Sequence, residues 1–377
     1  MLELQFQENV IEEDEDEAEA LEYRVGRHLR RRLRARSVTN FELTSEPAQD
    51  VLVTVEQGVL SGSVVTSALG APNAASRGVP YATPPLGELR FQVRFLSTGD
   101  EVIPGNAGLK DQLLALRWLQ QNLAAFGGDP AKVTIGGESA DGASVSHHLI
   151  APSSAGLYRA TTIESGDSVP PFGVTTVARQ KAFRLGEVLG VSANDSRQLL
   201  EFLRTQDAHE LAAHDRELLL DLDGLSAVVW APVVEPDLEG AFITEMPADN
   251  LKAGRFSKVP ERMSEDVVST APFGPPLLEN EALLQLVSDY FVPLVSTLLH
   301  LPTGAARLLA SVQVRDFYFG HSNITLEDAQ AIVDMMSDIF LVEPADSAVW
   351  IIANHSDSAP VYYYQFDYRG PELGNTT

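Results

Sequence analysis

The fold predicted for this chain of 377 residues is decided by the stretch Val133-Thr134-Ile135-Gly136-Gly137-Glu138-Ser139-Ala140-Asp141-Gly142. A run of β-branched residues from Val133 to Ile135 leads into a glycine-rich turn, and a helical pattern follows from Ala140 to about Ile150. The turn has the layout Gly-x-Ser-x-Gly, in which a sharp bend between a strand and a helix lifts a serine hydroxyl above the sheet. This layout predicts that Ser139 is a nucleophile.

One position departs from that layout, because its fifth residue is Asp141 in place of glycine. Glycine there lets the helix pack closely against the neighbouring strand, so we expect the Asp141 side chain to collide with that strand or to be buried without a partner. Its charge would also repel the oxyanion that forms when a serine attacks an acyl group. The alternative interpretation of the stretch is an incidental serine in a glycine-rich loop.

The segments that flank the elbow closely resemble the type-B carboxylesterases, the family that includes the cholinesterases and the insect esterases. The resemblance rests on the stretches Pro104–Ile135 and His147–Gly166, and on VTVEQGVLSGSVV, GVPYATPPLGELRF, WAPVVEPD, RDFYFG and PVYYYQFDYRG. It runs from about Val51 to the last residue. It implies an α/β-hydrolase fold, a central mostly parallel sheet flanked by helices, with Ser139 as nucleophile and the Ala140 backbone N–H as an oxyanion donor.

Part of the family pattern is missing from the printed chain. In the family, PPLGELRF precedes a long block with several strands and the HGGG segment of the oxyanion hole, but here PPLGELRF ends at Phe91 and a later part of the pattern has resumed by Phe95. No His-Gly-Gly-Gly occurs in the sequence. We therefore expect a charged N-terminal segment over residues 1–50 and a carboxylesterase domain over 51–377 that lacks part of its sheet and its oxyanion region through a deletion near 91–95.

The resemblance also places the two other catalytic groups. The family's histidine is expected after PVYYYQFDYRG, in a Gly-x-x-His pattern, yet the chain stops at Thr377, so we expect the general base to be absent. The family's acid falls on Asp266, with Glu265 as the second choice, and a solvated acidic turn is the alternative. His147 and His148 lie on the Ser139 helix roughly 12 Å away at ~1.5 Å per residue, so we expect them to be structural.

The remaining histidines do not suggest a substitute base. His321 and His355 occur in segments that lie far from the nucleophile in the family, while His209, His214 and His300 fall in helical patterns with no acid or serine partner suggested by the sequence.

Composition limits the partners. The net charge is −26, from 53 acidic and 27 basic residues, and this disfavours nucleic acid and anionic membrane surfaces. No apolar run is long enough for a membrane-spanning helix. We expect a small-molecule ester as substrate and no cofactor or metal, and the sequence leaves the oligomeric state open.

The cellular location stays open because the signals conflict. Cysteine is absent, which is typical of a cytosolic protein, and no signal peptide is visible at the start. The family is usually secreted, and there are Asn-x-Ser/Thr sequons at Asn194, Asn323, Asn354 and Asn375.

The first 50 residues match nothing in the family. An acidic run from Glu12 to Glu17 precedes a cluster of arginines between Arg27 and Arg36. Such charge blocks favour a solvated, disordered tail, and the alternative is a nuclear-localisation signal or a patch for an anionic partner.

Periodicity predicts several regular elements in the rest of the chain. Helices are expected over Asp111–Leu123, Arg179–Leu189, Ser196–Leu203, Leu277–Val287 and Leu326–Ile339. We expect the apolar stripe Leu113, Leu116, Leu119 and Leu123 to be core, and the aromatic run from Tyr362 to Tyr368 to be a buried strand.

Three hypotheses follow for function. The first is a carboxylic-ester hydrolase that is inactive or impaired as printed, because its base and most oxyanion donors are missing. The second is a non-catalytic relative used for binding or adhesion, which Asp141 favours because a missing segment does not explain a point change inside a retained one. The third is a chain that does not fold stably, since removing strands leaves their neighbours without pairing partners.

Overall fold

The computed structural model describes residues 3–6, 51–66, 70–84, 95–219, 228–266, 281–299, 305–320, 323–355 and 359–366. The chain divides into two compact units. The first unit is Met1–Pro84 with Arg117–Asp129, and the second is Pro85–Leu116 with Pro130–Thr377. Helix α2 (Ala107–Asn122) contributes residues to both.

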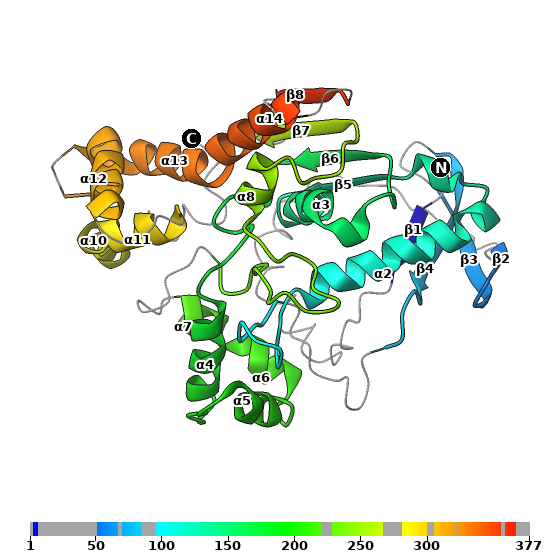
Figure 1. Cartoon of the computed structure of the whole chain (residues 1–377), viewed down its shortest axis with the longest axis horizontal. Helices are drawn as coiled ribbons and strands as arrows, with labels where there is room; N and C mark the ends of the chain where they lie inside the picture. Colours follow the sequence, from blue (N-terminus) through cyan, green and yellow to red (C-terminus); the bar gives the residue numbers. More distant parts are fainter. Residues whose placement is uncertain are drawn as a thin grey trace, which may run out of the picture. The chain divides into compact units, whose positions relative to one another are not determined.

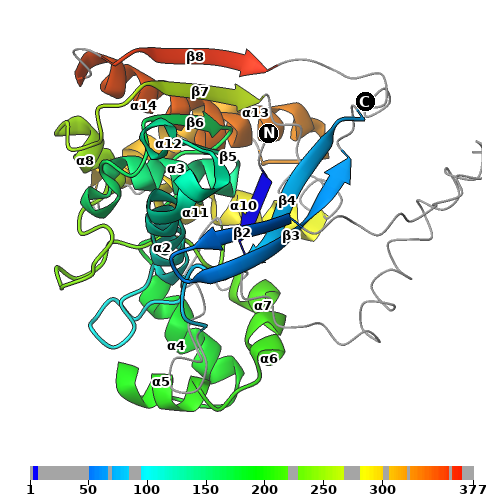
Figure 2. The same cartoon turned by 90° about the vertical axis from the view of Figure 1, so that its right-hand side faces the viewer.

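The first unit contains a small sheet with the strand order β1 (Glu3–Phe6), β4 (Pro72–Val79), β3 (Gly58–Thr66) and β2 (Val51–Val55). β2, β3 and β4 are antiparallel neighbours, and Figure 2 shows them as adjacent ribbons. Trp118 from the last part of α2 packs with Val55 and Val79 in the core of this unit. The Asn122 side chain accepts a hydrogen bond from Glu56 N (3.0 Å), which ties the end of α2 to the β2–β3 turn.

β1 lies inside the segment 1–50, for which we expect a disordered tail. It pairs in parallel with β4, with Glu3 opposite Ala75. The acidic run and the arginine cluster lie outside the described residues, so the disordered tail and the domain boundaries stay predictions.

The second unit is built on a parallel sheet, as the strand-turn-helix pattern predicts. Its strands follow one another in chain order: β5 (Thr134–Glu138), β6 (Ala160–Glu164), β7 (Glu261–Asp266) and β8 (Val361–Phe366). All three pairings are parallel, and Figure 1 shows the strands side by side. Their carboxyl ends therefore share one edge of the sheet, where ligand sites of open α/β sheets are found.

Three helices pack on this sheet or on one another: α3 (Ala140–Ile150), α8 (Pro247–Lys252) and α14 (Glu343–His355). α3 lies against β5 and β6, and α14 lies against β7 and β8. Leu149, Ile163, Met263 and Ile352 come from these helices and strands and meet in the main core of the unit.

Two further helical groups complete the unit, each with its own apolar core. The first comprises α4 (Ala178–Val188), α5 (Ser196–Leu203), α6 (Ala208–Ala213) and α7 (Asp215–Leu219). The second comprises α10 (Glu281–Asp289), α11 (Phe291–Leu298), α12 (Ala305–Phe319), α13 (Ala329–Ser337) and the π-helix η7 (Asp338–Val342). Short 3-10 turns occur at η2 (Leu123–Phe126), η3 (Pro130–Lys132), η4 (Pro152–Ser154) and η6 (Leu326–Asp328). In the part of the chain that the structure describes, no helix has both the length and the apolar character needed to cross a bilayer.

Most predicted elements are confirmed. The helix at Ser196–Leu203 has the expected bounds, and the predicted Leu113 and Leu116 core positions are buried. The expectation that the C-terminal aromatic strand is buried was wrong in part, because Tyr362 is 62% exposed. β8 is an outer strand of the described sheet, and its adjacent residues Tyr362 and Tyr363, which point to opposite faces of the sheet, are both exposed.

A fully buried glutamate connects the loop before α2 to the loop that precedes α8. The Glu235 carboxylate pairs with Lys110, and it also accepts from Asn106 Nδ2 (2.9 Å) and from the Phe242 backbone N–H (2.7 Å). Asn106 in turn holds both backbone groups of Val233, at 2.8 and 2.9 Å. Each charge and dipole in this cluster has a partner, which is the condition under which a buried carboxylate is tolerated.

Candidate active site

Ser139 occupies the turn between β5 and α3, with φ 54° and ψ −118°. Residues other than glycine rarely adopt this backbone conformation, and holding it costs on the order of 1–3 kcal/mol. Two backbone hydrogen bonds fix the turn: Ser139 N donates to Glu164 O at the end of β6 (2.8 Å), and Ala143 N donates to Ser139 O (3.0 Å). The neighbouring strand and the helix thus impose the strained conformation from both sides.

Three glycines allow the backbone to close around Ser139. A Cβ on Gly166 would lie 2.1 Å from the Ser139 carbonyl oxygen, and a Cβ on Gly142 would lie 2.8 and 2.9 Å from the carbonyl oxygens of Gly166 and Glu164. A Cβ on Gly137 would lie 2.4 Å from the Asp141 carbonyl carbon. None of these distances leaves room for a side chain, so the elbow requires glycine at all three positions.

Asp141 does not disturb this packing, contrary to the sequence-based expectation. Its side chain is exposed. The residue of α3 that faces β6 is the next one, Gly142, which is buried against Glu164 and Gly166. Gly137 leaves space for the Asp141 Cβ, so the substitution is absorbed on the solvent side of the helix.

The Ser139 side chain is exposed, at the end of β5 and the start of α3. Ala140 is the first helical residue, and the N–H of such a residue has no acceptor within its own helix. Such an N–H can donate to an anion at the start of a helix, and the donor role of Ala140 stays a prediction. Among the described residues, no side chain forms a hydrogen bond with the Ser139 hydroxyl.

His147 and His148 are buried core residues, as predicted. His147 Nε2 lies 2.6 Å from Gly173 O, and His148 Nδ1 lies 2.8 Å from Ser154 Oγ. Burial lowers the pKa of each imidazole to about 4, so both stay neutral above that pH. Both imidazoles form their hydrogen bonds with residues other than Ser139, so neither acts on its hydroxyl.

The other described histidines lie on helices remote in sequence from the elbow. His214, between α6 and α7, contacts Glu217 of α7 (3.1 Å), so the expectation that it has no acid partner was wrong. His355 closes α14 and its Nδ1 lies 3.0 Å from Ile351 O. His300 and His321 lie outside the described residues. No base for Ser139 is present among the histidines that the structure describes.

The predicted acid Asp266 is the last residue of β7, where it pairs with Phe366 of β8. Ser139 and Asp266 both lie at the carboxyl edge of the sheet, Ser139 after β5 and Asp266 at the end of β7. Because β6 lies between these two strands, their backbones are ~10 Å apart at ~4.8 Å per strand. The side chains of Asp266 and Glu265 lie outside what the structure describes. The assignment of Asp266 stays a prediction.

Two buried acids, one just beyond the end of β6 and one at the amino end of β7, were not found by sequence reasoning. Burial raises the pKa of Asp167, just beyond β6, to about 7. Burial and the nearby Asp167 carboxyl raise the pKa of Glu261, the first residue of β7, to about 8. Neither Glu261 oxygen has a hydrogen-bond partner in the described part of the structure. The sequence did contain a signal for Glu261, because a glutamate at the start of a parallel strand that is covered on both faces is expected to be buried.

Among the described residues, no three histidine, aspartate or glutamate side chains are placed to share a metal ion. The chain contains no cysteine that could act as a ligand.

Comparison with known proteins identifies what the chain resembles. A family model described as the carboxylesterase family matches residues 93–375. Venom carboxylesterase-6 of Apis mellifera is 32% identical over 283 residues, which cover 73% of this chain and 50% of that protein. Esterase FE4 of Myzus persicae is 31% identical over 278 residues, covering 73% and 48%. Esterase S of Drosophila virilis is 41% identical over 168 residues, covering 44% and 31%. The chain spans about half the length of the first two relatives.

Proposed function

Since this chain belongs to the carboxylesterase family, we propose that it is a carboxylic-ester hydrolase in which Ser139 forms the acyl-enzyme. The family has the α/β-hydrolase fold, and the parallel sheet β5 to β8 with its covering helices is the core of that fold. The observation that carries the proposal is the strained Ser139 backbone, which the glycines at 137, 142 and 166 accommodate. Strain of this kind persists only where the surrounding structure enforces it.

The chemistry proceeds in two steps. Ser139 Oγ attacks the ester carbonyl carbon, loses its proton to a base, and the resulting oxyanion accepts a hydrogen bond from the Ala140 N–H. The C–O bond to the alcohol then breaks, and the alcohol leaves with a proton. Water attacks the acyl-enzyme in the same way, which releases the carboxylic acid and restores Ser139.

The rate depends on the base and on the number of oxyanion donors. One lost oxyanion donor typically costs ~100- to 1,000-fold in rate, and the HGGG segment does not occur in this sequence. No described histidine contacts Ser139. We therefore expect slow acylation of Ser139 and impaired turnover, with Asp266 as the predicted acid partner of any base.

The alternative, a non-catalytic binding relative, was motivated by Asp141. The exposure of that side chain weakens this motivation, because the elbow geometry is intact in its presence. The hydrolase proposal is thus the better supported of the two.

The test is covalent labelling of the full chain with a fluorophosphonate, followed by peptide mass spectrometry, together with hydrolysis of a short-chain aryl ester. We expect the adduct on Ser139, and weak turnover that imidazole in the buffer increases by supplying a base. Ser139→Ala should lose both signals. The matched control Ser144→Ala, on the same helix, should keep both, because Ser144 bonds only to the Ala140 carbonyl (3.1 Å).

Labelling at another residue, or none in a sample whose circular dichroism shows a folded chain, would overturn the proposal. Imidazole-dependent turnover that survives Ser139→Ala would do the same, since it would be solution catalysis.

A further inference from the structure

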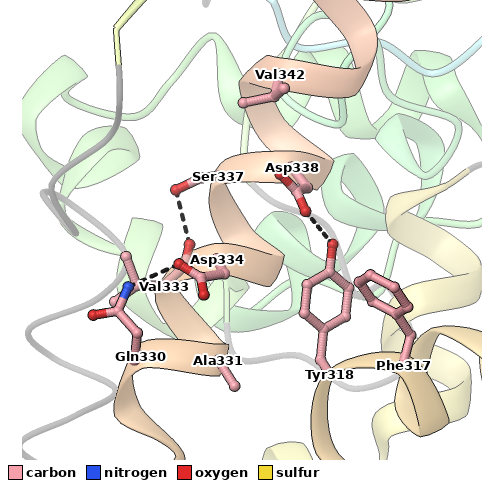
Figure 3. Close-up of a pocket in the computed structure, with 9 residues that line it drawn as sticks. All are labelled: Phe317, Tyr318, Gln330, Ala331, Val333, Asp334, Ser337, Asp338 and Val342. Atoms are coloured by element: carbon pink, nitrogen blue, oxygen red, sulfur yellow. Dashed lines mark hydrogen bonds between the residues drawn. The ribbon is translucent and has the colours of Figure 1, made fainter. Parts of the chain in front are cut away.

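A cavity of about 550 Å³ lies between α12 and the helix formed by α13 and η7 (Figure 3). This volume is within the range of small-molecule sites, ~300–1,000 Å³. All the residues that line it come from these three elements, so it is distinct from the elbow at Ser139. The π-helical turn of η7 brings Asp338 and Val342 to its wall, and such turns often occur at functional sites.

One wall of the cavity is acidic. Gln330, Asp334 and Asp338 follow one another at intervals of four residues, which places them on the same helix face. Asp334 accepts a hydrogen bond from Gln330 Nε2 (2.8 Å), and Asp338 accepts one from the Tyr318 hydroxyl. Within the described residues, neither carboxylate has a lysine or arginine partner. Two like charges one turn apart repel each other, and a cation between them would remove that repulsion.

The facing wall is aromatic. The rings of Phe317 and Tyr318 meet edge to face, with centroids 4.8 Å apart and an interplanar angle of 83°. Phe317 is 79% exposed, so its ring is open to a ligand at the mouth of the cavity. The face of an aromatic ring attracts a cation within ~6 Å of its centroid, and more strongly where water is partly excluded.

The electrostatic environment favours positive charge. Burial raises the pKa of the Tyr318 phenol, and its hydrogen bond to Asp338 and the neighbouring charges of Asp338, Glu343 and Asp334 raise it further. The carboxylates of Asp334, Asp338 and Glu343 therefore act on the phenol, and the same charges would stabilise an incoming cation.

We propose that this cavity binds a monovalent organic cation with an apolar substituent, such as an arylalkylammonium ion. The ammonium group lies against Asp334 and Asp338, and the substituent packs against Phe317, Tyr318 and Val342. An inorganic divalent ion fits less well, because Ca²⁺ takes six to eight oxygen ligands, whereas the cavity offers two carboxylates that already accept hydrogen bonds.

The first test is isothermal titration calorimetry of the full chain with phenethylammonium chloride and, separately, with 2-phenylethanol, its neutral match. We expect the cation to bind at least ~10-fold more tightly than the alcohol, and its affinity to fall with added salt. Equal affinities would overturn the proposal. Ser139→Ala should bind the cation unchanged, which separates this site from ester hydrolysis.

The second test uses variants of the two walls. We expect Asp334→Asn to weaken binding of phenethylammonium ~5- to 10-fold, and Phe317→Ala to weaken it ~5-fold without affecting the fold, because Phe317 is largely exposed. Asp346→Asn is the matched control, since Asp346 is an exposed carboxylate on α14 and does not line the cavity. An equal loss in Asp346→Asn would mean that the net charge of the chain, and not this cavity, attracts the cation.

Discussion

The elbow at Ser139 and the strand β7 belong to one sheet, with only β6 between them. The residues around the elbow fit one another closely, whereas β7 buries a polar group that its described neighbours leave without a hydrogen bond. At the elbow, three close backbone approaches fall on glycines. In β7, the Glu261 carboxylate is 2% exposed and has no hydrogen-bond partner in the described structure. The part of the site that shapes the nucleophile is complementary to its neighbours, whereas the strand that carries the predicted acid contains an uncompensated group.

The largest expected effect comes from Glu261→Gln at alkaline pH. Burial raises the pKa of Glu261 from 4.5 to about 8, so between these values the folded chain binds a proton that the unfolded chain has lost. The free energy of unfolding of the parent therefore falls as pH rises from about 4.5 to 8, by on the order of 5 kcal/mol at 1.36 kcal/mol per unit. Denaturant unfolding at pH 5 and pH 9 should show the variant close to the parent at pH 5 and clearly more stable at pH 9.

Glu235→Gln is the contrasting control, because Glu235 is equally buried but fully partnered. The substitution leaves the Lys110 charge without its carboxylate, and it should destabilise the chain by about 3 kcal/mol at both pH values. If both glutamine variants changed stability in the same direction at pH 9, the contrast between a matched and an unmatched buried glutamate would not hold.

The next largest effect is expected for Gly166→Ala. The new Cβ would lie 2.1 Å from the Ser139 carbonyl oxygen, which is backbone and cannot rotate away. We expect a loss of about 3 kcal/mol in the free energy of unfolding and loss of fluorophosphonate labelling at Ser139. Thermal unfolding and the labelling rate check the two effects, and a stable variant with normal labelling would contradict the close packing of the elbow.

A smaller loss of stability is expected for Gly142→Ala, and Gly136→Ala is its control. Gly142→Ala places a Cβ 2.8 Å from a carbonyl oxygen and should lose about 1–2 kcal/mol, because better helix propensity offsets part of the clash. In Gly136→Ala the nearest atom is 3.4 Å away, which is an ordinary contact. That variant should match the parent within ~0.5 kcal/mol in denaturant unfolding, and equal losses in both would show that the effect is not specific to the elbow.

The smallest effect is expected for Asp141→Asn. Asp141 is an exposed residue in the first turn of α3, where a negative charge interacts favourably with the helix dipole. Removing the charge should lower stability by only ~0.5 kcal/mol. The same variant should label Ser139 slightly faster, because the oxyanion is no longer repelled, and a large loss of stability would show that Asp141 packs as a core residue.

The sequence was informative where the structure is local. The elbow, α3 and α5 follow from residues within about ten positions of one another, and turn chemistry and helical periodicity are signals of that range. His147 and His148 were correctly placed away from Ser139, because the rise of a helix fixes that separation.

The sequence was less informative where burial depends on distant partners. Tyr362 is exposed because β8 is an outer strand of the described sheet. Asp141 is exposed because α3 is oriented with Gly142, and not Asp141, against β6. Two partners of Glu235, the Asn106 and Lys110 side chains, are more than a hundred positions away along the chain. Short-range patterns carry no signal for contacts of this kind.

The hydrogen bond from Ser139 N to Glu164 O connects the elbow to the end of a different strand. The amide is therefore protected from hydrogen exchange by the docking of β6 as well as by the start of α3. Fraying of a helix end releases its first amides easily, whereas separating β5 from β6 requires a larger cooperative opening. The Ser139 amide should accordingly exchange with the slow amides of the sheet, at a rate that reports how firmly the two strands hold together.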